Sequence, residues 1–261
     1  MFSLKGKVAL VTGSGRGIGR AIAEGLAAQG ASVACAARTV PELEEVAAEI
    51  QEKGGDAMAV SLDMGELEGL EPALEMVTGR FGKLDILINN AGTNARQPIE
   101  EVDEETYDRI MDVNLKGLYF LSQKAARIMK QGGGGKIINI GSLTTGYALG
   151  KVSVYTATKG AVGQLTKSQA IEFGKHNIQV NAICPGFVVT SLTEKMWADP
   201  TMREWGESRI ALGRLADPSD MVGTAAFLAS PASDYVTGQS IYVDGGFMAG
   251  DNWPLPEAAT S

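Results

Sequence analysis

The sequence predicts an α/β fold in which one mainly parallel sheet carries helices on both faces. Strand-like apolar runs alternate with segments of helical periodicity along the chain, which is typical of βαβ units. The first run, KVALVTG at 7–13, is continuously apolar, as expected for a strand that is buried on both faces of a parallel sheet. No internal repeat and no change of composition divides the 261 residues, so we expect a single doubly wound domain over residues 1–261.

The elements can be assigned in order from periodicity and from glycine and proline stops. Apolar runs predict strands at 7–13, 31–38, 56–63, 84–92, 136–142, 178–186 and 240–246. Helical spacing predicts helices at 17–30, 41–55, about 66–80, two within 103–130, 153–174 and 218–230. Gly30 ends the first of these helices, and Pro41 opens the second.

Charge and hydropathy exclude several classes of protein. The formal net charge is −8, which argues against a basic surface for nucleic acid. No apolar run reaches the ~20 residues that span a bilayer, and the first residues lack the pattern of a signal peptide. We therefore expect a cytoplasmic protein with a small-molecule substrate and no membrane partner.

Cysteine and histidine are too scarce for metal or histidine chemistry. Cys35 and Cys184 have the spacing of neither a zinc site nor a disulfide framework, and we interpret both as small core residues. His176 is the single histidine and lies in a polar link. The sequence predicts no metal site, and an enzyme with this composition needs another acid or base.

A glycine-rich turn joins the first strand to the first helix. Gly13, Gly17 and Gly19 give the spacing G-x-x-x-G-x-G, and missing β-carbons let a phosphate approach the backbone at a helix N-terminus. The alternative is a plain tight turn. Its place at the first strand–helix junction of a βαβ series favours dinucleotide binding.

The end of the second strand bears on the choice between NAD and NADP. An acidic residue there accepts from the ribose of NAD, but this strand ends in Arg38, whose planar fork suits a 2′-phosphate. Arg16 supplies a second positive charge, and Asp63 can accept from the adenine amino group. The sequence thus favours NADP(H) over NAD(H), with a solvated Arg38 stacked on adenine as the alternative.

Tyr155 and Lys159 lie four residues apart in SVYTATKG, so they share one face of a helix. Taken alone, the pair is most simply a solvated helix surface. A tyrosine can act as an acid or base near neutral pH when a neighbouring cation lowers its pKa of about 10.

The motifs together resemble the short-chain dehydrogenase/reductase family over nearly the whole chain. They are T-G-x-x-x-G-I-G at 12–19, Asp63, N-N-A-G at 89–92, Asn114, Ser142, Y-x-x-x-K at 155–159 and P-G-x-x-x-T at 185–190. The resemblance implies a Rossmann-type sheet of about seven parallel strands, a homotetramer and NAD(P)-dependent oxidation of a secondary alcohol or reduction of a ketone.

The resemblance also assigns residues. The implied catalytic set is Asn114, Ser142, Tyr155 and Lys159. Together with the glycine turn, the implied cofactor contacts are Gly13, Ser14, Arg16, Gly17, Ile18, Gly19, Arg38, Asp63, Met64, Asn90, Ala91, Gly92, Tyr155, Lys159, Pro185, Gly186, Val188 and Thr190. A substrate lid is expected at about 187–212, irregular or helical from 191, and a C-terminal arm at about 248–261.

The substrate is less clearly indicated. The sequence looks most like the branch that contains gluconate 5-dehydrogenases and 2-deoxy- or 2-keto-3-deoxygluconate dehydrogenases. Arg96, just past the fourth strand, can bind a substrate carboxylate beside Ser142 and Tyr155, unless it is a surface arginine. Trp197 and Trp205 in the lid suit an apolar substrate such as a small cyclic ketone, or a neighbouring subunit. The alternatives are a 3-oxoacyl-[acyl-carrier-protein] reductase and a non-catalytic cofactor sensor.

Overall fold

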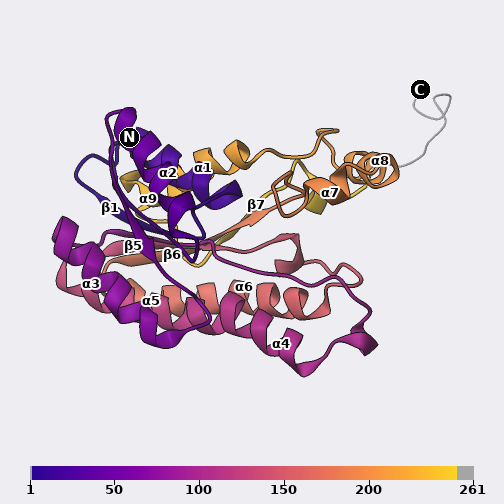
Figure 1. The fold of residues 1–261 in the computed structure, drawn as a ribbon, viewed down its shortest axis with the longest axis horizontal. Coiled ribbons are helices and arrows are strands. Elements are labelled where there is room, and N and C mark those ends of the chain that lie inside the picture. The colour runs from indigo at the N-terminus through magenta and orange to yellow at the C-terminus, as the bar shows by residue number, and fades with distance from the viewer. Residues whose placement is uncertain (1, 252–261) are drawn as a thin grey trace.

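The computed structural model describes residues 2–251, in which seven parallel strands form one sheet (Figure 1). The strands are Val8–Thr12 (β1), Ser32–Ala37 (β2), Asp56–Ser61 (β3), Ile86–Asn89 (β4), Gly135–Ile140 (β5), Ile178–Pro185 (β6) and Ser240–Val243 (β7). Their spatial order is β3-β2-β1-β4-β5-β6-β7. Six strands lie within the segments predicted for them, and β5 begins one residue before its predicted segment, at Gly135. The predicted α/β class is confirmed.

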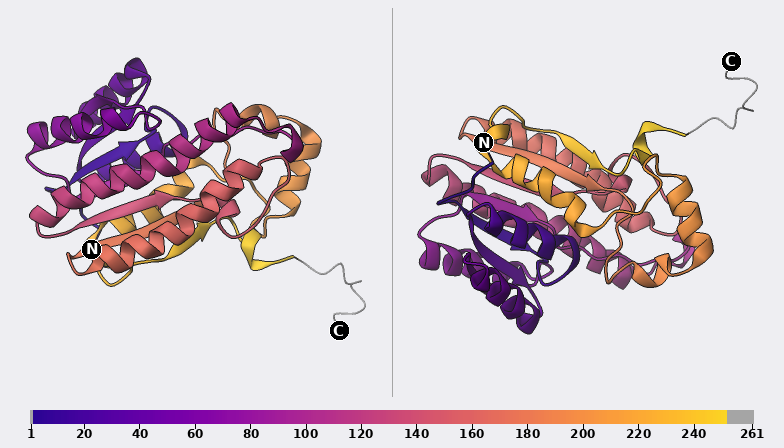
Figure 2. Two further views of the ribbon diagram at one scale, coloured as in Figure 1. Left: turned by 90° about the horizontal axis from the view of Figure 1, so that it is seen from below. Right: turned by 90° about the horizontal axis from the view of Figure 1, so that it is seen from above.

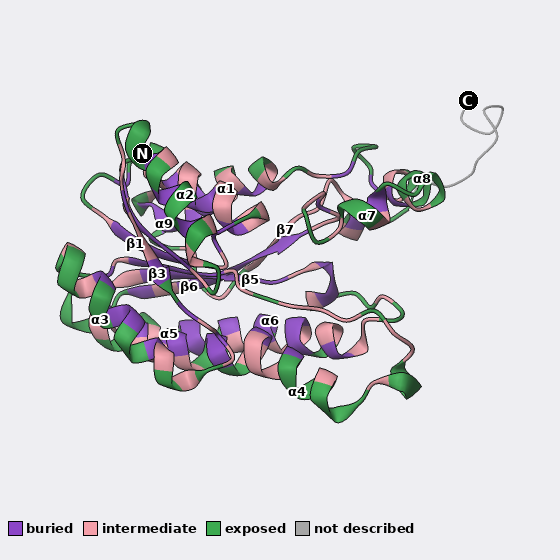
Figure 3. Cartoon of the chain, in the orientation of Figure 1, coloured by how far each residue is buried: buried purple, intermediate pink, exposed green. Residues whose placement is uncertain are grey.

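Helices cover both faces of the sheet, as Figures 1 and 2 show. They are Gly17–Ala28 (α1), Val40–Glu52 (α2), Leu70–Phe81 (α3), Glu104–Met111 (α4), Gly117–Gln131 (α5), Ser153–Gly174 (α6), Glu194–Trp197 (α7), Pro200–Ser208 (α8) and Val222–Ala229 (α9). One core cluster packs α1, α2 and α9 on the sheet, and a second packs α3, α5 and α6 on the opposite face. The strands between these layers are largely buried (Figure 3), which explains their continuous apolar runs.

The 103–130 region departs from two simple helices. A π-helical turn at Asp112–Lys116 joins α4 to α5 without a break. Such turns are rare in proteins, and those that occur are frequently found at functional sites. Side-chain periodicity does not distinguish a π turn from an α-helical one, so the sequence analysis had no signal for it.

The strand order reverses between β1 and β4, which are neighbours in the sheet. Ligands bind in open α/β sheets at the carboxyl ends of strands where the order reverses. Here the glycine turn follows β1 and the N-N-A-G segment follows β4. Asn90 joins them, because its side-chain amide donates to the carbonyl oxygens of Thr12 (2.9 Å) and Gly13 (3.0 Å).

Buried polar residues hold β4 and β5 together beneath that site. The Asn89 amide donates to Ser122 (2.8 Å) and to Asn139 (2.9 Å), and Asn139 donates to Thr166 (3.0 Å). These groups are almost fully buried, so their hydrogen bonds offset the cost of removing them from water.

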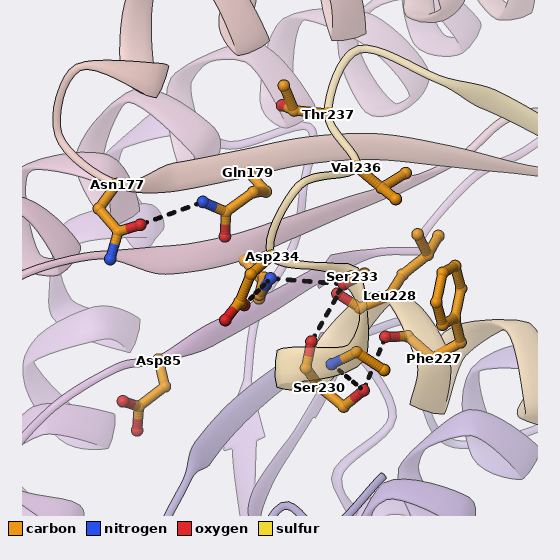
Figure 4. A network of polar contacts seen from close by, with 12 residues as sticks. Asp85, Asn177, Gln179, Phe227, Leu228, Ser230, Ser233, Asp234, Val236 and Thr237 are labelled. Carbon is orange, nitrogen blue, oxygen red and sulfur yellow. Dashed lines mark hydrogen bonds and ion pairs between the residues drawn. The ribbon is translucent and has the colours of Figure 1, made fainter. Parts of the chain in front are cut away.

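A further polar network lies at the other end of the sheet, where β5 begins (Figure 4). Lys136 donates to Asp234 (2.8 Å) and Ser233 (3.3 Å), and Ser230 donates to the carbonyl oxygen of Phe227 (2.9 Å). The network ties the end of α9 to the start of β5. Lys136 and Ser230 each have hydrogen-bond partners within the protein, so we assign the network a structural role.

The chain has two further features that bear on the predictions. No helix within residues 2–251 is both long and apolar enough to cross a membrane.

Of the expected C-terminal arm at 248–261, residues 252–261 lie outside the described part of the chain. Asp251 forms an ion pair with Arg209 (3.1 Å).

Candidate active site

The glycine turn and the start of α1 form one wall of a cavity of about 360 Å³. Gly13 and Gly17 adopt positive φ angles of 65° and 57°, which favour glycine. A β-carbon on Gly13 would lie 2.9 Å from the Cα atom of Ala91. Helix α1 has no side-chain N-cap and no acidic residue in its first turn, so its N–H groups suit an anionic phosphate.

Two residues that were predicted to contact the cofactor, Ser14 and Gly19, lie within the turn and do not line the cavity. Ser14 is fully buried and Gly19 nearly so, and neither lines the cavity. A β-carbon on Gly19 would collide with the carbonyl oxygen of Gly13 and the amide of Asn90. Glycine is therefore needed at position 19 for close packing of α1 against the turn.

The part of this cavity next to β2 carries charges of both signs. Arg38 is largely exposed, and its Nη1 lies 3.8 Å from Oδ2 of Asp63, while Oδ1 of Asp63 accepts from the Gly65 N–H (2.9 Å). Arg16 also lines this cavity. Glu42 and Arg109 line it as well, and the sequence analysis missed both because no motif contains them.

A second cavity, of about 580 Å³, adjoins the first. Both cavities are lined by Ile18, Asn90, Gly92, Thr93, Thr190 and Leu192. The structure brings Ser142, Tyr155, Lys159 and Arg96 together around the second cavity. The other predicted cofactor residues that line one or both cavities are Met64, Ala91, Pro185, Gly186 and Val188.

Tyr155 and Lys159 project from successive turns of α6, with the Lys159 Nζ 5.6 Å from the centre of the Tyr155 ring. The Lys159 ammonium donates to the carbonyl oxygen of Ile140 (2.7 Å). Burial lowers the pKa of Lys159 to about 8, because removing a cation from water disfavours its charged form.

The pKa of Tyr155 is raised, whereas we expected the neighbouring Lys159 to lower it. Burial raises this pKa, and a hydrogen bond with Ser142 and the charge of Arg96 lower it only in part. The protein's own groups therefore hold the phenol protonated at neutral pH. A positively charged ligand beside the phenol would act in the opposite direction.

Ser142 is held at the carboxyl end of β5 by local hydrogen bonds. Its Oγ accepts from the Thr144 N–H (3.2 Å), and its own N–H donates to the Thr145 hydroxyl (3.1 Å). This reciprocal pair caps a short 3-10 turn at Leu143–Thr145. The hydroxyl is thus fixed in place beside Tyr155.

Asn114 is fully buried in the π-helical turn and lines neither cavity. Its Oδ1 accepts from the Thr93 N–H (2.7 Å), and its amide donates to the Thr93 carbonyl (2.9 Å) and the Thr158 hydroxyl (3.3 Å). A β-carbon on Gly92 would lie 3.4 Å from Asn114 Oδ1 and 3.8 Å from Lys159 Nζ. Asn114 therefore packs against α6 and against the segment at Gly92–Thr93.

Aromatic residues of the predicted lid form an apolar wall of the second cavity. Phe187 packs against Trp197 (centroids 5.1 Å apart) and Trp205 (5.5 Å). Trp197 is buried, and Trp205 is partly exposed. Tyr147 packs edge-on against Phe247 and does not line the cavity.

Several cavity residues are not among the predicted site residues, and they lie in loops or, for Met196 and Met202, in α7 and α8. These are Thr93, Asn94, Leu149, Lys151, Phe187, Leu192, Met196 and Met202.

Comparisons with known proteins agree on one group of enzymes. Residues 13–248 match the family model described as Enoyl-(Acyl carrier protein) reductase. The chain is 42% identical over 249 residues to 2-dehydro-3-deoxy-D-gluconate 5-dehydrogenase of Dickeya dadantii (strain 3937), covering 95% of this chain and 98% of that one.

Two solved structures are similar throughout. A gluconate 5-dehydrogenase from Burkholderia cenocepacia J2315, in complex with NADP and tartrate, has a TM-score of 0.92 and 37% identity. A short-chain type dehydrogenase/reductase from Mycobacterium marinum has a TM-score of 0.90 and 38% identity. Each comparison covers 95% of this chain and 98% of the other.

Proposed function

The chain belongs to the short-chain dehydrogenase/reductase family and is an oxidoreductase that acts on a CH–OH group, and we propose that its substrate is a sugar acid of the gluconate type. The observation that carries the proposal is that Ser142, Tyr155 and Lys159 share one cavity with Arg96, next to the dinucleotide cavity. Two of the relatives named above are dehydrogenases named for gluconate or 2-dehydro-3-deoxy-D-gluconate.

Tyr155 moves the proton in this proposal. Oxidation of a carbinol removes a hydride from carbon and a proton from oxygen. The glycine turn and Arg38 would hold a nicotinamide dinucleotide, which would supply or accept the hydride. The Tyr155 Oη takes the proton in oxidation and donates it in reduction, while the Ser142 hydroxyl orients the substrate oxygen.

Lys159 and Asn114 support the tyrosine. The Lys159 ammonium, already bonded to the Ile140 carbonyl, retains donors for the nicotinamide ribose. Asn114 positions the segment at Gly92–Thr93 and a water that links Lys159 to solvent. Asn114 acts through its neighbours and is a positioning residue.

Arg96 gives the site its preference for an acid. It lines the cavity, and its charge acts to lower the pKa of Tyr155, although burial keeps that pKa raised overall. A guanidinium binds a carboxylate in a bidentate manner.

The aromatic wall of Phe187, Trp197 and Trp205 favours the second candidate, a small cyclic ketone.

Replacement of Arg96 by methionine is expected to raise KM for a sugar acid about tenfold or more, because the charge-assisted hydrogen bonds to the carboxylate are lost. The pKa of Tyr155 should also rise, which moves the acid limb of the oxidation pH profile upward. Steady-state kinetics should include gluconates, cyclic ketones and an acetoacetyl thioester with both cofactors. Turnover of cyclic ketones or the thioester alone would contradict the sugar-acid proposal.

The cofactor is proposed to be NADP(H) rather than NAD(H). The relevant cavity is lined by Arg16, Arg38 and Arg109 and by the acidic residues Glu42 and Asp63, so its charge is net positive. The loose contact of Arg38 with Asp63 leaves the guanidinium available to a 2′-phosphate. The similar gluconate 5-dehydrogenase structure contains NADP.

Replacement of Arg38 by aspartate should weaken NADPH binding about 10–100-fold and leave NADH binding unchanged or improved, because the acid repels the 2′-phosphate and accepts from the ribose hydroxyl. Titration of tryptophan fluorescence measures both constants. Arg127→Asp, an equal charge change on the exposed face of α5, is the control. An unchanged NADPH-to-NADH ratio in the Arg38 variant would refute the assignment.

The family resemblance implies the assembly, and the hydropathy of the sequence indicates the location. We propose a homotetramer in the cytoplasm. Light scattering coupled to size-exclusion chromatography would test the assembly, and a stable monomer would contradict it.

A further inference from the structure

We propose that Lys151 is a second anion-binding residue of the substrate cavity and that it acts with Arg96 to select acids over neutral polyols. Both side chains line the 580 Å³ cavity. The inference rests on the proposed function and extends it to a residue that lies outside the motifs.

The charge balance of the cavity is the first observation. Its lining includes Arg96, Lys151 and Lys159, and no aspartate or glutamate of residues 2–251 is among its lining residues. The whole chain carries a formal net charge of −8. A cluster of cations in an acidic protein, without acidic residues between them, raises the local concentration of anionic ligands.

The backbone of Lys151 is the second observation. Its φ angle is +64°, which is uncommon for a residue other than glycine, asparagine or aspartate. Unfavourable backbone conformations of this kind concentrate at ligand sites, where the surrounding structure holds them. Here the Lys151 carbonyl accepts from the Gln97 N–H (2.9 Å).

That hydrogen bond places the two cations on adjoining loops. Gln97 directly follows Arg96, so the bond joins the loop after β4 to the loop before α6. Two like charges brought together repel one another in the absence of an anion. A bound carboxylate removes this repulsion, so the arrangement favours an anionic ligand.

The N-terminus of α6 adds to the positive potential. The helix runs for 22 residues from Ser153, and it has neither a side-chain N-cap nor an acidic residue in its first turn. Val152, its N-cap residue, also lines the cavity. The partial positive charge at this helix end acts in the same direction as Arg96 and Lys151.

The test compares tartrate with threitol, which has the same carbon chain and no charge. Binding of each to the enzyme–NADP complex is followed by fluorescence, since Trp197 and Trp205 line the cavity. Lys151→Met should weaken tartrate binding about tenfold and change threitol binding less than twofold. Lys151→Arg should restore tartrate binding.

Lys175→Met is the matched control, because Lys175 lies at the opposite end of α6 and is exposed. It should leave both ligands unaffected. Equal loss of tartrate and threitol binding in Lys151→Met, or no loss of tartrate binding, would overturn the proposal. The test measures binding and does not require turnover. Failure to turn over any sugar acid would therefore contradict the proposed function and leave the proposal for Lys151 intact.

Discussion

Replacement of Tyr155 by phenylalanine is expected to lower kcat by about 10²–10⁴-fold, the range for loss of a positioned general acid or base. The change removes the Oη and keeps the ring against Lys159, so the dinucleotide cavity is unaffected. Binding of NADPH, measured by fluorescence titration, should stay within about twofold of the wild-type value. Steady-state turnover in both directions measures the loss.

Tyr147→Phe is the control for this experiment. Tyr147 is a neighbouring tyrosine that packs on Phe247 and does not line the cavity, so its variant should retain wild-type turnover. Substantial activity in Tyr155→Phe would show that another group moves the proton. Loss of cofactor binding in that variant would point to a structural defect.

Replacement of Lys159 by methionine is expected to lower turnover and to change the free energy of unfolding in a different way. Turnover should fall about a hundredfold or more, because the donors that would hold the nicotinamide ribose are lost. The free energy of unfolding should change with pH in a characteristic way. The pKa of Lys159 is about 8 in the folded protein and 10.5 in its unperturbed state.

The sign follows from proton binding. Below pH 8 both the folded and unfolded states carry the proton, so the full cost of burying the ammonium is present, roughly 3 kcal/mol. Between pH 8 and 10.5 the folded state loses its proton first, and this cost declines. Above pH 10.5 both states are neutral, and the cost is gone.

The stability of Lys159→Met relative to wild type should therefore be most favourable at pH 7 and should decline by roughly 3 kcal/mol towards pH 10.5. Loss of the hydrogen bond to Ile140 offsets part of the gain at every pH. Denaturant unfolding at several pH values measures the difference. Lys136→Met, which removes a lysine paired with Asp234, should destabilise the protein already at pH 7. A pH-independent difference for Lys159→Met would contradict a lowered lysine pKa.

Much of the fold and part of the site can be predicted from local sequence relations. The seven strands and the 153–174 helix follow from periodicity, which depends on neighbouring residues alone. The glycine turn is recognisable because positive φ angles at Gly13 and Gly17 favour glycine. Tyr155 and Lys159 are identified as a pair because positions i and i+4 share one helix face.

Other features depend on contacts between distant segments. Gly19 reads as part of a phosphate loop, yet it is required by its contact with Gly13 and Asn90. The π-helical turn around Asn114 forms where the chain packs against Thr93 and Thr158. The apolar wall of the cavity depends on the packing of Phe187 against two lid tryptophans.

The sequence by itself determined the order of strands and helices and the glycine turn, since each is expressed over a few neighbouring positions. The family resemblance of its motifs identified the residues proposed to move the proton. The tertiary structure alone decided how charges act at the site. Burial raises the pKa of Tyr155 and lowers that of Lys159, and a backbone hydrogen bond between two loops places Lys151 and Arg96 on the lining of one cavity. Both effects depend on how much water and which distant charges surround a group, and only the packed chain specifies those surroundings.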